Sequence, residues 1–267
     1  MRFLIGFLSF ILCATGALAC GETERCPVEG GYYLAAPPPG WDGNAPLPLI
    51  VYFHGWNSSP EGTFRNRAMI AAAHRRGALF VAPFARTGYW RQIGAGRAEG
   101  GRDERAYILA VMADIAARWP IDTERTLASG FSRGASMVWN IACYVGGLFA
   151  GYAPIAGGFW NTTPSGCPTG PVNLRHIHGL SDRVVAFDEI GIYNSRPIPE
   201  GLALLRDLND ADIRVDRTYV KGRLTCESWS GVQRKWVELC LHPRGHSIPA
   251  EWVAEGLDWL DNLAEAR

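Results

Sequence analysis

A serine flanked by glycines in the middle of the chain has the surroundings of an activated nucleophile. Residues 130–134 read Gly-Phe-Ser-Arg-Gly and separate a predicted strand, Thr126 to Ala128, which we expect to break at Ser129-Gly130, from a predicted helix that begins near Ala135. Glycines permit a sharp turn that lifts the serine hydroxyl above the sheet, and the amides of the following helix favour developing negative charge. Ser132 is therefore the candidate nucleophile; an ordinary glycine-rich turn is the alternative interpretation.

A serine hydroxyl is a weak nucleophile at neutral pH, so it needs a base, and histidine is the usual one. Strand–nucleophile–helix enzymes place their catalytic residues in the chain order serine, acid, histidine. His54 and His74 precede Ser132, so they do not fit this order. His176 and His178 lie along a predicted strand, which suggests a structural role. His246 lies in a loop before the last predicted helix and is the candidate base. His242, just before Pro243, is the alternative.

The carboxylate that orients this base is expected to follow a strand between the serine and the histidine. Asp182 comes just after the predicted strand Val172 to His178. Asp188 is the alternative, because loop lengths do not fix which of the two carboxylates reaches the imidazole. In either case the acid holds the imidazole in the correct tautomer and stabilises its cation.

Two backbone amides are needed to stabilise an oxyanion, one from the residue after the nucleophile and one from a loop after an early strand. Arg133 supplies the first. His54-Gly55 directly follows the predicted strand Leu49 to Phe53, so Trp56 is the candidate for the second amide and Asn57 the next choice. The alternative is a strand-ending turn with no part in catalysis.

The rest of the chain alternates apolar runs with segments of helical periodicity. This alternation predicts an α/β fold with a mostly parallel sheet and helices on both faces. Strands are predicted at Leu47 to Phe53, Ala78 to Ala82, Gly151 to Ile155, Val172 to His178 and Asp216 to Val220. Helices are predicted at Phe64 to Arg76, Glu104 to Trp119, Ala135 to Tyr144, Pro199 to Leu208 and Val253 to Leu263. Ser230-Gly231 predicts a hairpin between Cys226 and Cys240.

The amino-terminal residues have the pattern of a secretory signal. Arg2 precedes the apolar run Phe3 to Leu12, and Ala17-Leu18-Ala19 resembles a cleavage site. We expect residues 1–19 to be a signal peptide, residues 20–267 to form one catalytic domain, and the protein to be secreted or periplasmic. A membrane-spanning helix is the alternative, and lipid attachment at Cys20 also remains open.

Six cysteines remain after residue 19, an even number suited to an oxidising compartment. Fifteen pairings are possible. Their grouping favours the local pairs Cys20–Cys26, Cys143–Cys167 and Cys226–Cys240. A zinc site is the alternative, but the spacing lacks paired two-residue gaps and there is no histidine cluster, so we predict neither a metal nor a cofactor.

The charge balance gives no sign of a polyanionic partner. Lysine plus arginine number 26, the same as aspartate plus glutamate, so no overall field attracts nucleic acid or an anionic membrane. We expect the partner to be a small or neutral molecule.

The motifs together resemble the secreted polyhydroxybutyrate depolymerase and feruloyl esterase group of α/β-hydrolases, over most of the mature chain. The resemblance rests on an early cysteine before Gly30-Gly31-Tyr32-Tyr33, on His54-Gly55, on Ile121-Asp122 before Arg125, on His178-Gly179 to Asp182-Arg183-Val184-Val185, and on Gly245-His246-Ser247-Ile248-Pro249. It implies an α/β-hydrolase fold and a serine esterase in which the histidine of the last motif, His246, is the base.

Two positions depart from this family. Many members have a cysteine where this chain has Trp56, and a small or amide residue where it has Arg133. Both positions border the expected site, so substrate choice does not carry over. Only a short segment follows His246, which favours a soluble ester over a solid polyester. Five aromatic residues either face the expected site, where they would stack on a substrate, or lie in the core, and the sequence leaves both interpretations open: Trp56, Tyr89, Trp90, Phe159 and Trp160.

These residues predict hydrolysis of a carboxylic ester through an acyl-enzyme. A serine peptidase on the same fold is one alternative, although such enzymes usually carry an additional cap or propeller domain. A binding protein that retains the fold without catalysis is another.

Overall fold

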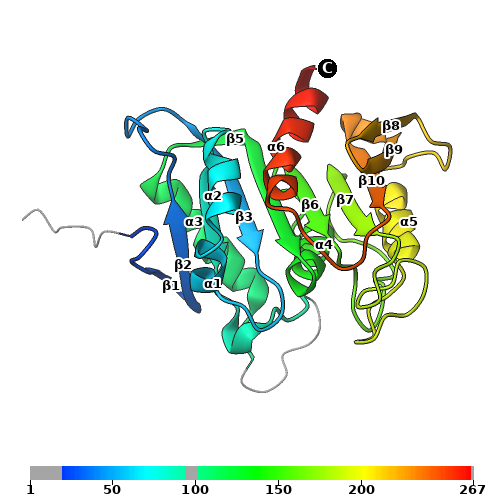
Figure 1. The fold of residues 1–267 in the computed structure, drawn as a ribbon, viewed down its shortest axis with the longest axis horizontal. Helices are drawn as coiled ribbons and strands as arrows, with labels where there is room; N and C mark the ends of the chain where they lie inside the picture. The colour runs from blue at the N-terminus through cyan, green and yellow to red at the C-terminus, as the bar shows by residue number, and fades with distance from the viewer. Residues whose placement is uncertain (1–19, 94–100, 266–267) are drawn as a thin grey trace, which may run out of the picture.

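A computed structural model describes residues 20–93 and 101–265 (Figure 1). The expected signal peptide, residues 1–19, lies outside them. No helix within the described residues is long and apolar enough to cross a bilayer. Ten strands form one sheet in this part of the chain. They are β1 (Cys26–Val28), β2 (Gly31–Ala36), β3 (Leu47–Phe53), β4 (Leu79–Pro83), β5 (Ile121–Phe131), β6 (Gly151–Ile155), β7 (Leu174–Gly179), β8 (Arg217–Lys221), β9 (Leu224–Ser230) and β10 (Trp236–His242).

The sheet has a parallel centre and antiparallel margins. Its order is β1-β2-β4-β3-β5-β6-β7-β10-β9-β8. Strands from β4 to β10 in this order pair in parallel, whereas β1 and β2 at one margin and β9 and β8 at the other pair antiparallel. The carboxyl ends of the parallel strands meet at one edge, where ligand sites of open α/β sheets lie.

Helices cover both faces of this sheet (Figure 1). They are α1 (Pro60–Phe64), α2 (Arg67–His74), α3 (Glu104–Arg118), α4 (Arg133–Tyr144), α5 (Ile198–Leu208) and α6 (Ala250–Glu265). Successive strand residues point to opposite faces. In β3, Leu49 and Val51 join the core with α3, α4 and α5, whereas Ile50 and Tyr52 join the core with α1, α2 and α6. Both faces of the central strands are buried, which explains their continuous apolar runs.

The predicted fold class is confirmed, and two local predictions were wrong. The helix expected from Phe64 to Arg76 is divided into α1 and α2, because the Asn66 side chain accepts a hydrogen bond from the Met69 amide at 3.3 Å and begins a new helix. Strand β5 does not break at Ser129-Gly130 but continues to Phe131. Strands β1 and β2 were not predicted.

Three disulfides join Cys20 to Cys26, Cys143 to Cys167 and Cys226 to Cys240. These are the pairs that the cysteine grouping favours. The last joins directly opposed residues of β9 and β10, and so closes the expected hairpin. The Cys20 sulfur is bonded to Cys26, so here it carries no free thiol for a lipid. Among the described residues, the cluster with metal-ligand spacing is Cys226, Glu238 and Cys240, whose two sulfurs are oxidised to a disulfide and are not thiolates.

Candidate active site

Ser132 occupies a sharp turn between β5 and α4. Its backbone has φ 55° and ψ −122°, a conformation that few non-glycine residues adopt. Its amide donates a hydrogen bond to the Ile155 carbonyl at 3.0 Å, which ties the turn to the end of β6. Such a backbone costs about 1–3 kcal/mol and persists only where the surroundings impose it. Ser132 is thus held between the strand end and the first turn of a helix.

The first turn of α4 passes so close to the end of β3 that only glycine fits at position 134. A Cβ atom at Gly134 would lie 1.9 Å from the Phe53 carbonyl oxygen, a distance that no side chain tolerates. A Cβ atom at Gly157 would lie 2.3 Å from the Ser132 carbonyl oxygen. These two glycines let the backbones on both sides approach the turn.

His246 and Asp182 form a hydrogen-bonded pair. His246 Nδ1 lies 2.7 Å from Asp182 Oδ2, and the Asp182 side chain is buried. Asp182 Oδ1 accepts the amides of Val184 at 2.8 Å and Val185 at 3.0 Å. Burial tends to raise the pKa of Asp182, but the bond to His246 and these two amides outweigh it, so the pKa lies below its usual value. The carboxylate is therefore ionised at neutral pH and fixes the imidazole.

The loop between β10 and α6 carries His246 to the serine turn. The His246 ring lies against the ring of Phe131, the residue before Ser132, with centroids 4.6 Å apart. Ser132 and His246 also line one pocket of about 450 Å³. The structure thus brings together the three residues that the sequence suggested for a triad.

The alternative residues lie elsewhere. Asp188 is exposed, and the carboxylate bonded to His246 is that of Asp182. The His242 ring is buried against Trp252, at a centroid distance of 4.8 Å, and its Nδ1 accepts the Arg244 amide at 3.2 Å. His242 therefore belongs to the packing beneath the loop.

His176 and His178 form a buried chain behind Asp182. His178 Nε2 donates to the Val185 carbonyl at 2.9 Å, which leaves His178 Nδ1 to accept from His176 Nε2 at 2.9 Å. Burial lowers the pKa of His178 to about 4 and also lowers the pKa of His176 well below its usual value. Both rings are neutral at pH 7. Because Val185 also donates its amide to Asp182, this chain supports the loop that holds the carboxylate.

The two residues suggested to supply oxyanion amides are Arg133, which follows Ser132 in the chain, and Trp56. The Arg133 amide belongs to the first residue of α4. Trp56 lines the same pocket as Ser132. The amide of Asn57, the second choice, donates to the Gly88 carbonyl at 2.8 Å, so it is already engaged. Trp56 is therefore the better placed of the two.

The aromatic residues divide between core and surface. Trp90, Phe159 and Trp160 are 1%, 2% and 7% exposed and belong to the core. Trp56 and Tyr89 are 56% and 36% exposed. Tyr193, at 50% exposure, joins them with its ring centroid 5.2 Å from that of Trp56. Tyr193 was not predicted as a site residue from the sequence, because it lies in an irregular segment with no motif.

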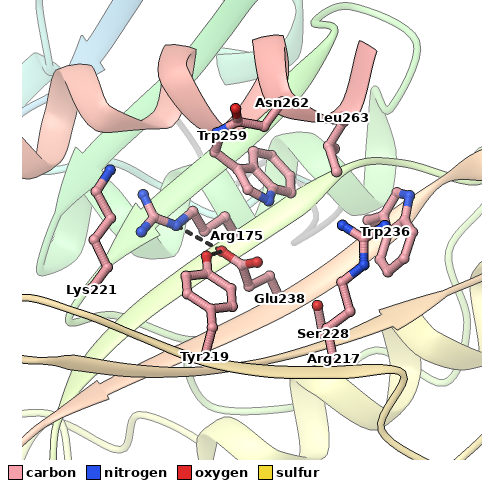
Figure 2. A pocket seen from close by; sticks show the side chains of 10 residues that line it. All are labelled: Arg175, Arg217, Tyr219, Lys221, Ser228, Trp236, Glu238, Trp259, Asn262 and Leu263. Atoms are coloured by element: carbon pink, nitrogen blue, oxygen red, sulfur yellow. Dashed lines mark hydrogen bonds and ion pairs between the residues drawn. The ribbon is translucent and has the colours of Figure 1, made fainter. Parts of the chain in front are cut away.

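A second pocket of about 270 Å³ lies at the opposite end of the strands, near the start of β7 and β10. Figure 2 shows Arg175 and Tyr219 pointing toward the Glu238 carboxylate. Arg175 Nε and the Tyr219 hydroxyl each donate to Glu238 Oε1 at 2.9 Å. Burial raises the pKa of Glu238, although Arg175 opposes this effect. None of the candidate triad residues lines this pocket.

Comparisons with known proteins show which curated sequences this chain resembles. No protein-family model matches the chain. A probable feruloyl esterase C of Aspergillus niger is 26% identical over 168 residues, which cover 60% of this chain and 58% of that protein. A bifunctional acetylxylan esterase/xylanase of Neocallimastix patriciarum is 24% identical over 143 residues, which cover 54% of this chain and 20% of that protein. The chain thus spans less than two thirds of the length of these curated relatives.

The matches to solved structures cover a larger share of this chain than the sequence matches do. An acetyl xylan esterase from Aspergillus awamori superposes with a TM-score of 0.62 at 15% identity, covering 86% of this chain and 93% of that one. A Bacillus cereus carboxylesterase has a TM-score of 0.52 at 14% identity, with 86% and 93% coverage. At such identities the likeness concerns the fold. Together with the sheet order and the serine turn, it establishes that the chain has the α/β-hydrolase fold.

Proposed function

We propose that this protein is a serine esterase that hydrolyses carboxylic esters. The observation that carries the proposal is the His246–Asp182 hydrogen bond of 2.7 Å beside the pocket that Ser132 and His246 share. Sequence similarity to feruloyl esterases C supports ester hydrolysis as the reaction class. An esterase of the feruloyl or acetylxylan type is the description that fits best, with a small or oligomeric soluble ester as substrate.

The proposed reaction has two halves. Ser132 Oγ attacks the ester carbonyl while His246 Nε2 takes its proton, and Asp182 stabilises the resulting imidazolium. The amides of Arg133 and Trp56 bind the oxyanion, after which His246 protonates the leaving alcohol. Water then attacks the acyl-enzyme by the same route and releases the acid. The strained turn at Ser132 holds the hydroxyl in place before substrate arrives.

We further propose that residues 1–19 are removed during export and that residues 20–267 form one secreted or periplasmic catalytic domain. Support comes from the signal-like sequence and from three disulfides, which persist in oxidising compartments.

The test compares residues 20–267 with its Ser132→Ala variant and with Ser165→Ala, which removes an exposed serine. The substrates are p-nitrophenyl acetate, butyrate and octanoate, and methyl ferulate. We expect hydrolysis by the parent and by Ser165→Ala, and a loss of at least about 10³-fold in Ser132→Ala. Equal rates in all three proteins, or none in any, would contradict the proposal. The preferred ester distinguishes aliphatic from phenolic acyl groups.

A further inference from the structure

Five side chains form a closed series of contacts beside Ser132. We refer to Trp56, Tyr193, Trp160, Arg133 and Tyr89 as the Arg133 circuit. The Trp56 ring lies 5.2 Å from Tyr193, and Tyr193 stacks on Trp160 at 6.1 Å with an interplanar angle of 20°. The Arg133 guanidinium carbon lies 4.5 Å from the Trp160 ring and 6.0 Å from Tyr89, which lies 6.3 Å from Trp56. Four rings from four separate loops and one cation therefore form this series, and the cation contacts two of the rings, Trp160 and Tyr89.

Among the described residues, the cation in this circuit has no carboxylate partner. Arg133 Nε donates to the Trp90 carbonyl at 2.9 Å. Within residues 20–93 and 101–265, no carboxylate lies within 4.0 Å of its guanidinium. The charge of Glu104 raises the pKa of Arg133 at a distance, but the Glu104 carboxylate forms its ion pair with Arg102, at 2.6 Å. Burial lowers the pKa of Arg133 to about 10, so the group remains a cation at neutral pH.

A cation withdrawn from water without a counter-charge is costly, and an anionic ligand removes that cost. Guanidinium groups bind carboxylates through two parallel hydrogen bonds. The exposed rings of the circuit, Trp56, Tyr89 and Tyr193, supply a stacking surface, whereas Trp160 is buried beneath the guanidinium. Both features favour a ligand that is aromatic and carries a carboxylate.

We propose that the Arg133 circuit is a substrate subsite for an aromatic group bearing a free carboxylate, so that half-esters of aromatic dicarboxylic acids are preferred. This proposal rests on the proposed esterase function. Arg133 follows Ser132 directly, and their Cα atoms are about 3.8 Å apart. The subsite therefore requires that the guanidinium hold the carboxylate of a substrate whose ester carbonyl, one aromatic ring away, is at Ser132. Water is the only other reactant, and the products are a dicarboxylic acid and an alcohol.

The kinetic test uses two matched esters, monomethyl terephthalate and methyl 4-carbamoylbenzoate, which differ by a carboxylate and a neutral amide. The measured quantity is kcat/KM for the anionic ester divided by kcat/KM for the neutral ester. A variant that slows the hydrolysis of both esters equally leaves this ratio unchanged. We expect the parent to favour the anionic ester, and Arg133→Gln to reduce this ratio about tenfold, mainly through KM. Arg105→Gln, which removes an exposed arginine of α3, is the matched control and should retain the parent ratio.

A binding test separates this proposal from the esterase proposal. Terephthalate is titrated calorimetrically into the Ser132→Ala protein and into Ser132→Ala/Arg133→Gln. We expect about tenfold weaker binding to the double variant, and weaker binding of terephthalate to Ser132→Ala as salt increases. No preference for the anionic ester, or equal affinity in both proteins, overturns the subsite even if p-nitrophenyl acetate is hydrolysed. Binding that depends on Arg133 in a protein without esterase activity supports the subsite and overturns the esterase assignment alone.

Discussion

His246 Nδ1 and Asp182 Oδ2 are 2.7 Å apart although the two residues lie on loops after different strands, β10 and β7. Strands β7 and β10 are parallel neighbours, so both loops leave the sheet at the same edge. The remaining Asp182 oxygen is occupied by backbone amides, so the carboxylate has one orientation available.

Asp182→Asn should therefore preserve the fold but reduce kcat by about 10³–10⁴-fold, because the amide favours the wrong imidazole tautomer. The measurement is kcat for p-nitrophenyl acetate together with a thermal melt. Asp188→Asn is the control, since that exposed carboxylate is not the one bonded to His246, and it should keep parent activity. Comparable losses in both variants would show that Asp182 has no special place in the reaction.

Stability should fall in mild acid because His178 is buried in its neutral form. Its folded pKa of about 4 lies below the unfolded value of about 6.5, so between these pH values the unfolded chain binds a proton that the folded chain does not. The free energy of unfolding should therefore decrease as the pH falls from 6.5 toward 4, and His178 contributes about 3 kcal/mol of this decrease. Urea unfolding across this range checks it, and His178→Gln should flatten the slope.

The Arg175–Glu238 pair makes a separate prediction for stability. Both side chains are almost fully buried, and their contact is 2.9 Å. Arg175→Met should lower the free energy of unfolding by about 3–5 kcal/mol, because it leaves a carboxylate buried without its cation. Arg175→Met/Glu238→Gln should recover part of this loss in urea titrations. A single variant as stable as the parent would mean that Glu238 is protonated in the folded protein.

The disulfides should differ in their contribution to stability. Cys226–Cys240 closes a sequence separation of 14 residues, whereas Cys20–Cys26 closes 6. Loop-closure entropy gives about 3 kcal/mol for the longer loop, so replacing Cys226 and Cys240 by serine should lower the melting temperature. The matched replacement of Cys20 and Cys26 should lower it less, and the opposite order would contradict the entropic argument.

The sequence predicted the central elements well because they are buried on both faces. Leu47 to Phe53 and Gly151 to Ile155 match β3 and β6 at both ends, since a short apolar run bounded by turn-forming residues is typical of a buried strand. The division at Asn66 depends on one side-chain cap, and the continuation of β5 through Ser129-Gly130 depends on pairing with β3 and β6. Neither leaves a periodic signal in the sequence.

The candidate triad could be named from chain order and motifs, because strand-ending turns place such residues at one edge of the sheet. The surroundings of the triad could not. Which rings face solvent is decided by loop paths, so Trp90 and Trp160 entered the core while Trp56 remained exposed. Tyr193 became a neighbour of Trp56 only through the fold.

The two outer strands of the sheet bear on how the protein behaves at high concentration. One edge, β1, is only three residues long, contains Pro27, and is fixed by the Cys20–Cys26 bridge. The other, β8, begins with Arg217 and ends with Lys221. Short, proline-containing and positively charged edges resist pairing with strands of other molecules. Both borders of a sheet whose interior is strongly apolar are thus protected against edge-to-edge aggregation.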